Sequence, residues 1–168
     1  MLAVEFSLPA LSLAGWQQGP TQQKVTLCLH GWLDNADSFL PLSACLNELN
    51  LVAIDLPGHG LSQHRSLDAH YHFLDWIYDL ATLIKIQGWQ QVDIIGHSMG
   101  GMIGSVLAAV MPQMVRKLVL IDSMGLVTGE AGKTTEQIRS AINHRWQSPH
   151  KQKPVYPDLQ SAAPVSYT

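Results

Sequence analysis

The most constraining feature of this sequence is a serine flanked by glycines, placed between a compact apolar strand and an apolar helix. Residues 92–95 read Val-Asp-Ile-Ile, and residues 96–101 read Gly-His-Ser-Met-Gly-Gly. An apolar stretch of helical length follows at 102–111. A serine at such a strand–turn–helix corner has a strained backbone and a side chain that stands clear of the sheet. The pattern predicts a nucleophile elbow with Ser98 as the nucleophile.

The residues around the serine support this interpretation. We expect glycine to be required at Gly96 and Gly100, because a Cβ at either position would collide with the neighbouring strand or helix. The N-terminus of the helix favours negative charge that develops beside Ser98. A glycine-rich turn that merely packs tightly is the alternative. A phosphate-binding loop is disfavoured, because the run has neither G-x-G-x-x-G nor a closing Lys-Ser/Thr.

Strands and helices alternate along the rest of the chain. Apolar patterns predict strands over 4–8, 11–16, 25–29, 51–54 and 118–121, and helices over 37–49, 69–87 and 134–146. This order implies right-handed crossovers and a mostly parallel, doubly wound sheet with helices on both faces. The first two strands should form an edge, and Gly88 should end the second helix. The sequence therefore predicts an α/β fold.

Composition and charge exclude several classes of protein. The 168 residues are 46% hydrophobic with a formal net charge of −3 and no stripe of Lys and Arg. This profile argues against a disordered segment and against a nucleic-acid partner. No apolar run reaches the roughly 18 residues needed to span a bilayer. No membrane partner is expected.

The N-terminus and the cysteines indicate the compartment. The first residues have no basic stretch and Glu5 interrupts the apolar ones, so a secretory signal is not expected. Cys28 and Cys45 are too few for a disulfide framework and are expected to be buried free thiols. We expect a cytoplasmic protein.

An acyl-transfer site also needs N–H donors for the oxyanion of its tetrahedral intermediate. One donor is expected from Met99, the residue after the nucleophile, and the other from the loop 30–32, which reads His-Gly-Trp. Gly31 would allow the backbone to approach closely. His30 and His97 are interpreted as structural, with His97 pointing away from the serine hydroxyl.

Four motifs resemble those of the α/β-hydrolase superfamily in order and spacing. They are Leu-His-Gly-Trp-Leu-Asp-Asn at 29–35, Asp-Leu-Pro-Gly-His-Gly-Leu-Ser at 55–62, the elbow at 96–101, and Leu-Ile-Asp-Ser at 120–123. The stretch 28–39 is especially similar to the serine-hydrolase-like proteins of that superfamily. The resemblance is strong over residues 2–130 and looser over 131–160.

The resemblance implies an α/β-hydrolase fold, with residues 1–128 as the N-terminal part of the core. Residues 129–168 would be the start of a helical cap, partly irregular, and the sheet would be truncated after its sixth strand. By the same resemblance Ser98 is the nucleophile, and Trp32 and Met99 supply the oxyanion-hole amides. No cofactor is implied.

In this superfamily the catalytic acid and then the histidine follow the nucleophile along the chain. Asp122 lies at a variant acid position, after the sixth strand. An aspartate that only caps a turn is the open alternative. The only histidines downstream are His144 and His150, and neither is expected to reach Ser98. The base is therefore expected beyond residue 168.

The upstream histidines suggest no metal site. His70 and His72 have a spacing that some metal ligands use, but no other ligands match them. They are interpreted as the exposed start of a helix. His59 and His64 follow the fourth strand and have no evident partner in the sequence.

The leading functional hypothesis is hydrolysis of a small carboxylic ester through an acyl-enzyme on Ser98 in a longer form of the protein. The 168-residue chain alone is expected to be an incomplete, inactive fragment. A pocket lined by Trp32, Leu33 and Met99 would favour an apolar acyl group. The alternatives are a non-catalytic protein that binds a ligand or partner, and C–C hydrolysis or cofactor-free perhydrolysis on the same scaffold. Oligomeric state is left open.

Overall fold

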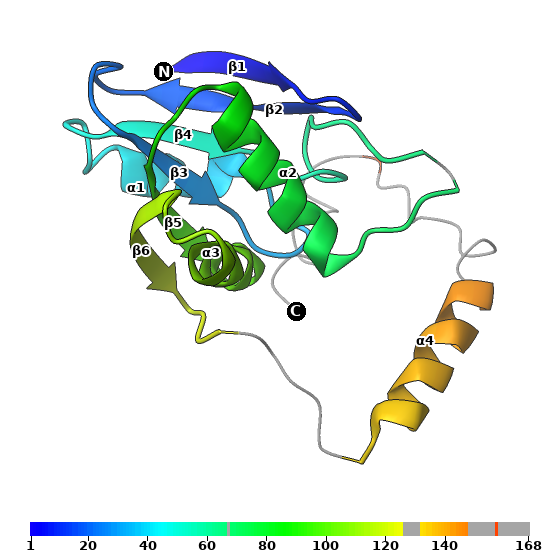
Figure 1. Cartoon of the computed structure of the whole chain (residues 1–168). Coiled ribbons are helices and arrows are strands. Elements are labelled where there is room, and N and C mark those ends of the chain that lie inside the picture. The colour runs from blue at the N-terminus through cyan, green and yellow to red at the C-terminus, as the bar shows by residue number, and fades with distance from the viewer. Residues whose placement is uncertain (67, 126–131, 148–156, 158–168) are drawn as a thin grey trace. The chain divides into compact units, whose positions relative to one another are not determined.

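The computed structural model describes residues 1–66, 68–125, 132–147 and 157 (Figure 1). The chain divides into two compact units, Met1–Leu126 and Val127–Thr168. The predicted domain boundary after residue 128 lies among residues 126–131, outside the described residues.

A six-stranded sheet forms the centre of the first unit (Figure 1). In spatial order its strands are β1 (Leu2–Ser7), β2 (Ser12–Gln18), β4 (Asn50–Ile54), β3 (Val25–Leu29), β5 (Val92–His97) and β6 (Val115–Ile121). β1 and β2 form an antiparallel hairpin at one edge, and β2 also runs antiparallel to β4. The pairs β4–β3, β3–β5 and β5–β6 are parallel. The predicted mostly parallel sheet with an edge hairpin is confirmed.

Apolar side chains pack on both faces of this sheet. Helices α2 (Phe73–Ile86) and α3 (Met99–Val110) cover one face with Leu80, Leu83, Ile103 and Leu107, all nearly inaccessible to solvent. On the other face, η1 (Ala36–Phe39) and α1 (Leu40–Ser43) pack over a smaller cluster that contains Trp16 and Ile95. β3 and β4 are buried along their whole length, as expected of central parallel strands.

The helix predicted over 37–49 is wrong in length and partly in kind. One 3₁₀ turn (η1) and one α-helical turn (α1) replace it, and turns bonded from residue i to i+3 follow. Polar side chains also donate to carbonyls of this region. Gln18 donates to the carbonyl of Ser43 at 2.9 Å, and Asn47 donates to that of Ala44 at 3.1 Å. Cys45 lies in this turn region and is exposed, so only Cys28 is the buried thiol that was predicted.

The remaining helices match their predictions apart from their ends. α2 begins at residue 73 and not at 69, where the carboxylate of Asp75 accepts from the N–H of His72 at 3.2 Å and caps the helix. Gly88 follows the end of α2 in a left-handed conformation (φ 67°). Helix α3 was predicted to start at residue 102. It starts at Met99, directly after Ser98.

The second unit contributes one described helix, α4 (Thr134–Gln147), close to the predicted 134–146. None of the helices in the described part of the chain is long and apolar enough to cross a membrane.

Candidate active site

Ser98 occupies the corner between β5 and α3. Its backbone adopts φ 48° and ψ −114°, a conformation that costs energy for a residue with a side chain. The Ser98 N–H donates to the carbonyl of Ile121 at 3.0 Å, and the Ser98 carbonyl accepts from Met102 N–H at 3.1 Å. The strain is therefore held in place by hydrogen bonds to β6 and to the first turn of α3.

Two glycines permit this corner, because backbone lies where their side chains would be. A Cβ on Gly96 would lie 2.6 Å from the Cα of Gly101, and a Cβ on Gly100 would lie 2.1 Å from the carbonyl oxygen of Leu29. Neither neighbour is a flexible side chain that could turn aside. Gly96 is therefore required for the approach of β5 to α3, and Gly100 is required for the packing of α3 on β3.

The two amides expected to bind an oxyanion carry no internal hydrogen bond. Neither Trp32 N–H nor Met99 N–H donates to any acceptor within the part of the chain that the structure describes. Met99 is 6% exposed, so its unpaired N–H is unusual for a buried residue. Met99 is also the first residue of α3, where the helix dipole favours negative charge.

His30 lies at the start of the loop that carries Trp32 and is completely buried. Its Nδ1–H donates to the carbonyl of Gly31 at 2.7 Å, and its Nε2 accepts from Leu56 N–H at 2.9 Å. This pairing requires the neutral ring, and burial lowers the pKa of His30, which keeps the ring neutral. The imidazole is thus fully used by the backbone and is not free to act on Ser98.

His97 lies beside the same loop. A Cβ on Gly31 would lie 3.1 Å from Nδ1 of His97 and 3.5 Å from Cβ of Ser98, so the three residues meet closely. Among the described residues, no hydrogen bond joins His97 to the hydroxyl of Ser98, and that hydroxyl has no other partner.

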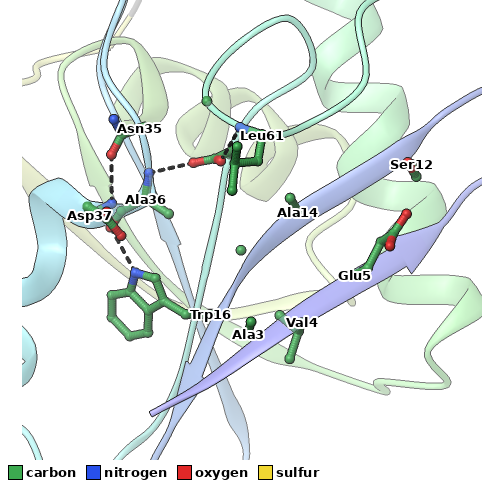
Figure 2. Close-up of a pocket in the computed structure, with 13 residues that line it drawn as sticks. Ala3, Val4, Glu5, Ser12, Ala14, Trp16, Asn35, Ala36, Asp37 and Leu61 are labelled. Atoms are coloured by element: carbon green, nitrogen blue, oxygen red, sulfur yellow. Dashed lines mark hydrogen bonds between the residues drawn. The ribbon is translucent and has the colours of Figure 1, made fainter.

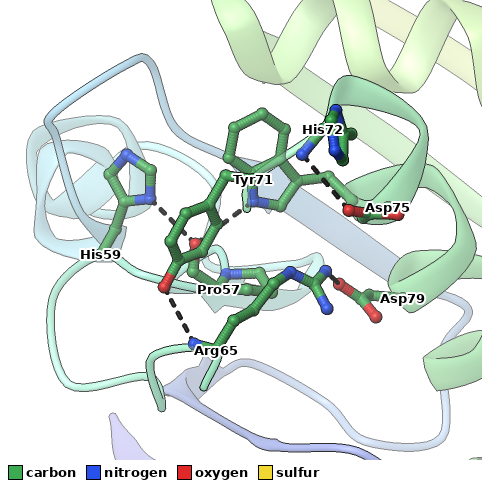
Figure 3. A network of polar contacts seen from close by, with 8 residues as sticks. Pro57, His59, Arg65, Tyr71, His72, Asp75 and Asp79 are labelled. Atoms are coloured by element: carbon green, nitrogen blue, oxygen red, sulfur yellow. Dashed lines mark hydrogen bonds and ion pairs between the residues drawn. The ribbon is translucent and has the colours of Figure 1, made fainter. Parts of the chain in front are cut away.

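An aromatic cluster supports the Trp32 side chain. Its indole packs edge-on against His59 at 5.5 Å and against Trp76 of α2 at 6.1 Å, measured between ring centroids. His59 is buried and its Nδ1–H donates to the carbonyl of Pro57 at 3.3 Å (Figure 3). No partner for His59 was evident from the sequence, and in the structure its ring packs against that of Trp32.

Asp122, the candidate acid, is the first residue after β6 and is exposed. Its backbone is left-handed with φ 48°. Of the downstream histidines, His144 lies on α4 in the second unit, and His150 lies outside the described residues.

The sequence interpretation missed Asp55, which follows β4. Its carboxylate is buried and accepts hydrogen bonds from Ala36 N–H and Leu61 N–H, each at 2.7 Å. The available signal was the polar residue directly after a buried strand, at the start of the 55–62 motif.

Asp55 also lines a hollow of about 850 Å³ against the β1–β2 hairpin (Figure 2). Ser98 is not among the residues that line this hollow.

Comparison with known proteins places this architecture in a family. The family model described as alpha/beta hydrolase fold matches residues 24–155. A serine hydrolase-like protein of Danio rerio is 38% identical over 86% of this chain and 45% of its own length. A human serine hydrolase-like protein is 36% identical over 92% of this chain and 76% of its own length.

Solved structures agree with this placement. A hypothetical protein of Pseudomonas aeruginosa PAO1 has a TM-score of 0.92 and 38% identity, covering 98% of this chain and 58% of that one. The thioesterase domain from the curacin biosynthetic pathway has a TM-score of 0.78 and 27% identity over 99% of this chain and 60% of that one. The chain spans less than half the length of the Danio rerio relative. It belongs to the α/β-hydrolase fold family, and the two curated relatives described above are serine hydrolase-like proteins.

Proposed function

We propose that this chain provides the nucleophile, the oxyanion hole and the orienting acid of a serine hydrolase that cleaves carboxylic esters through an acyl-enzyme. The observation that carries the proposal is the strained Ser98 beside two backbone N–H groups that donate to no acceptor among the described residues. Strain of this kind persists where the surrounding structure imposes it, and it concentrates at reactive sites.

In the first step, Ser98 Oγ attacks the ester carbonyl carbon as a general base removes its proton. Negative charge develops on the carbonyl oxygen, where Trp32 N–H and Met99 N–H donate to it. The C–O bond to the alcohol then breaks, and the base returns the proton to the leaving alcohol. Water repeats the sequence on the acyl-enzyme, which releases the carboxylic acid and restores the serine.

The acid is assigned to a residue of the described core, and the base is assigned to a histidine outside it. Asp122 is proposed as the carboxylate that orients the base, because it directly follows β6, the strand adjacent to β5, and has a strained backbone. The base is proposed to be a histidine outside the described core residues, since His30 is bonded on both ring nitrogens and His97 makes no bond to Ser98. A thioesterase domain among the similar structures is consistent with acyl transfer on this scaffold.

The exposed side chains beside the elbow favour an apolar acyl group. Trp32 is 59% exposed and Leu33 is 80% exposed, although both are apolar. Burial of such surface against an acyl chain is favourable by roughly 25 cal/mol per Å². In an active, full-length form, the rate of hydrolysis of p-nitrophenyl esters should rise from the acetate to the hexanoate. A preference for short charged acyl groups would contradict this assignment.

The experiment that tests the function is labelling of the purified chain with a fluorophosphonate probe. Ser98→Ala is the test variant. Ser105→Ala, on the same helix, is the matched control, because Ser105 Oγ donates only to the carbonyl of Gly101. Labelling that is lost in the first variant and kept in the second would support an activated Ser98. Absence of labelling in the chain alone agrees with a base that lies outside its core. A folded chain that does not label even after the C-terminal half of a full-length relative has been added would contradict the proposal.

A further inference from the structure

We propose that Asp55 is a positioning residue that fixes the oxyanion loop, defined here as Gly31–Asn35, through the N–H of Ala36. The inference rests on the proposed function, because it concerns the loop that carries the Trp32 amide. Asp55 touches no reacting atom in this assignment and acts only through the backbone.

The Asp55 carboxylate is shared between two backbone donors. Oδ1 accepts from Ala36 N–H and Oδ2 accepts from Leu61 N–H, each at 2.7 Å (Figure 2). The Asp55 residue is only 6% exposed. Hydrogen bonds to an ionised acceptor are about twice as strong as neutral ones, and they are strengthened further away from water.

The carboxylate is itself held in a single position. Asp55 N–H donates to the carbonyl of Ala14 at 2.9 Å, and Ser62 Oγ donates to the carbonyl of Asp55. Gly60 closes the remaining side with φ 51°, and a Cβ there would lie 2.1 Å from Oδ2. Asp55 is therefore held through its backbone and confined beside Gly60, and it can impose this geometry on the loop that it binds.

Both ends of the oxyanion loop are anchored on consecutive residues after β4. At the start of the loop, His30 accepts from the N–H of Leu56. At its end, Ala36 donates to Asp55. Between these anchors Leu33 adopts a left-handed backbone (φ 58°) with its side chain 80% exposed. Such a conformation requires support from outside the loop, and the two anchors supply it.

This arrangement makes the Trp32 amide depend on Asp55. Asparagine at position 55 keeps the shape but replaces one acceptor oxygen with an NH₂ group, so either Ala36 or Leu61 loses its bond. A displacement of about 1 Å at an active site can cost about 100-fold in rate. We expect the rate constant for reaction of Ser98 to fall only about tenfold in Asp55→Asn, because the His30 anchor remains.

The decisive test is amide exchange by NMR in the 168-residue chain and its variants. In Asp55→Asn, the N–H of at least one of Ala36 and Leu61 should exchange at least tenfold faster, because only one acceptor oxygen remains, and the amide resonance of Trp32 should move. The control is Asp37→Asn, an exposed carboxylate on η1 whose oxygens accept no hydrogen bond among the described residues. Unchanged exchange at Ala36 and an unmoved Trp32 resonance in a folded Asp55→Asn chain would overturn the proposal.

A second measurement covers the case in which Asp55→Asn does not fold. In the unaltered chain, Leu61 is 88% exposed, yet its N–H should exchange at least tenfold more slowly than that of Leu33 because it is bonded to Asp55. Equal exchange rates would overturn the proposal. Exchange does not depend on Ser98, so this result is independent of whether the chain reacts with a fluorophosphonate.

Where the unaltered chain does react, the labelling rate supplies a functional readout. The second-order rate constant, corrected for the folded fraction, should fall about tenfold in Asp55→Asn and stay constant in Asp37→Asn. A purely structural role for Asp55 would lower the unfolding midpoint without changing the corrected rate constant, and that outcome would overturn the proposal.

Discussion

The backbone N–H of Ser98 donates to the carbonyl oxygen of Ile121 at 3.0 Å, which fixes the elbow to the end of β6. The next residue is Asp122, so the nucleophile and the proposed acid lie at the carboxyl ends of adjacent parallel strands. Among the described residues, Leu33, Ser98 and Asp122 are the non-glycine residues with positive φ. They follow β3, β5 and β6, which are neighbours in the sheet. Strained backbone is thus concentrated at the carboxyl ends of these parallel strands, where the reaction is proposed to occur.

The first prediction concerns the glycines of α3. Gly100→Ala should destabilise the fold by more than about 2 kcal/mol, because its Cβ would meet the backbone of Leu29. Gly104→Ala is the matched control, since its nearest neighbours are side-chain methyl groups of Ile94 and Leu118 at 3.0 and 3.1 Å. That substitution also gains up to about 1 kcal/mol of helix propensity. Urea unfolding should show a large loss only for the first variant, and equal losses would contradict this account.

The second prediction is a pH dependence from His30. Burial lowers the pKa of His30 in the folded chain below its ordinary value of 6.5. The unfolded chain therefore binds the proton first as the pH falls, and the free energy of unfolding should decrease below about pH 6.5. One proton contributes a slope of at most about 1.4 kcal/mol per pH unit.

Unfolding curves measured between pH 7.5 and 5 should show this slope, and His30→Gln should reduce it. His72→Gln removes an exposed histidine at the start of α2 and serves as the control. A slope that is the same in the His30 variant as in the unaltered chain would show that another group is responsible.

The third prediction compares two ion pairs. Arg65 and Asp79 pair at side-chain exposures of 15% and 6% (Figure 3), and burial raises the pKa of Asp79 while Arg65 opposes that rise. Asp79→Asn would leave the Arg65 charge buried without its partner, at a cost of about 3 kcal/mol. Asp93→Asn breaks the more exposed pair with Arg116, whose side chains are 17% and 40% exposed, and should cost much less. Chemical denaturation of both variants would reveal the difference, and similar losses would contradict it.

The fourth prediction concerns the two thiols. Burial raises the pKa of Cys28 to about 12, whereas Cys45 is exposed. Because the thiolate is the reactive form, a thiol reagent at pH 8 should modify Cys45 quickly and Cys28 only after unfolding. In Cys45→Ser, the folded chain should therefore show almost no reaction until denaturant is added. Rapid reaction of the folded variant would indicate that Cys28 is accessible.

The sequence predicted those parts of the structure that depend on local patterns. Every strand was located from its apolar residues, and the elbow was located because strand, glycines and helix follow one another in the chain. The prediction of one helix over 37–49 was wrong, because turns bonded from residue i to i+3 follow α1, and Gln18, which is distant in sequence, also donates to the carbonyl of Ser43 there. Apolar spacing alone contains no information about that competing donor.

The same limit applies to the site. Asp55 reaches Ala36 across 19 positions in the sequence, and the two residues meet only because β3 and β4 pair in parallel register. The burial of His59 under Trp32 is likewise a product of tertiary packing. Residues that touch the reaction can be recognised from a motif, whereas residues that hold the motif in place become visible only in the fold.

The last prediction separates strain from function at Asp122. Asparagine tolerates a left-handed backbone as aspartate does, so Asp122→Asn should change the free energy of unfolding by less than about 0.5 kcal/mol. Asp122→Gly removes the steric cost of φ 48° and should keep the fold equally well or improve it slightly. If Asp122 orients the base, both variants should lose ester hydrolysis in an active, full-length form, and measurement of kcat would show the loss in each. If Asp122 only caps the turn, hydrolysis should survive in both variants, because neither disturbs the backbone that the turn requires.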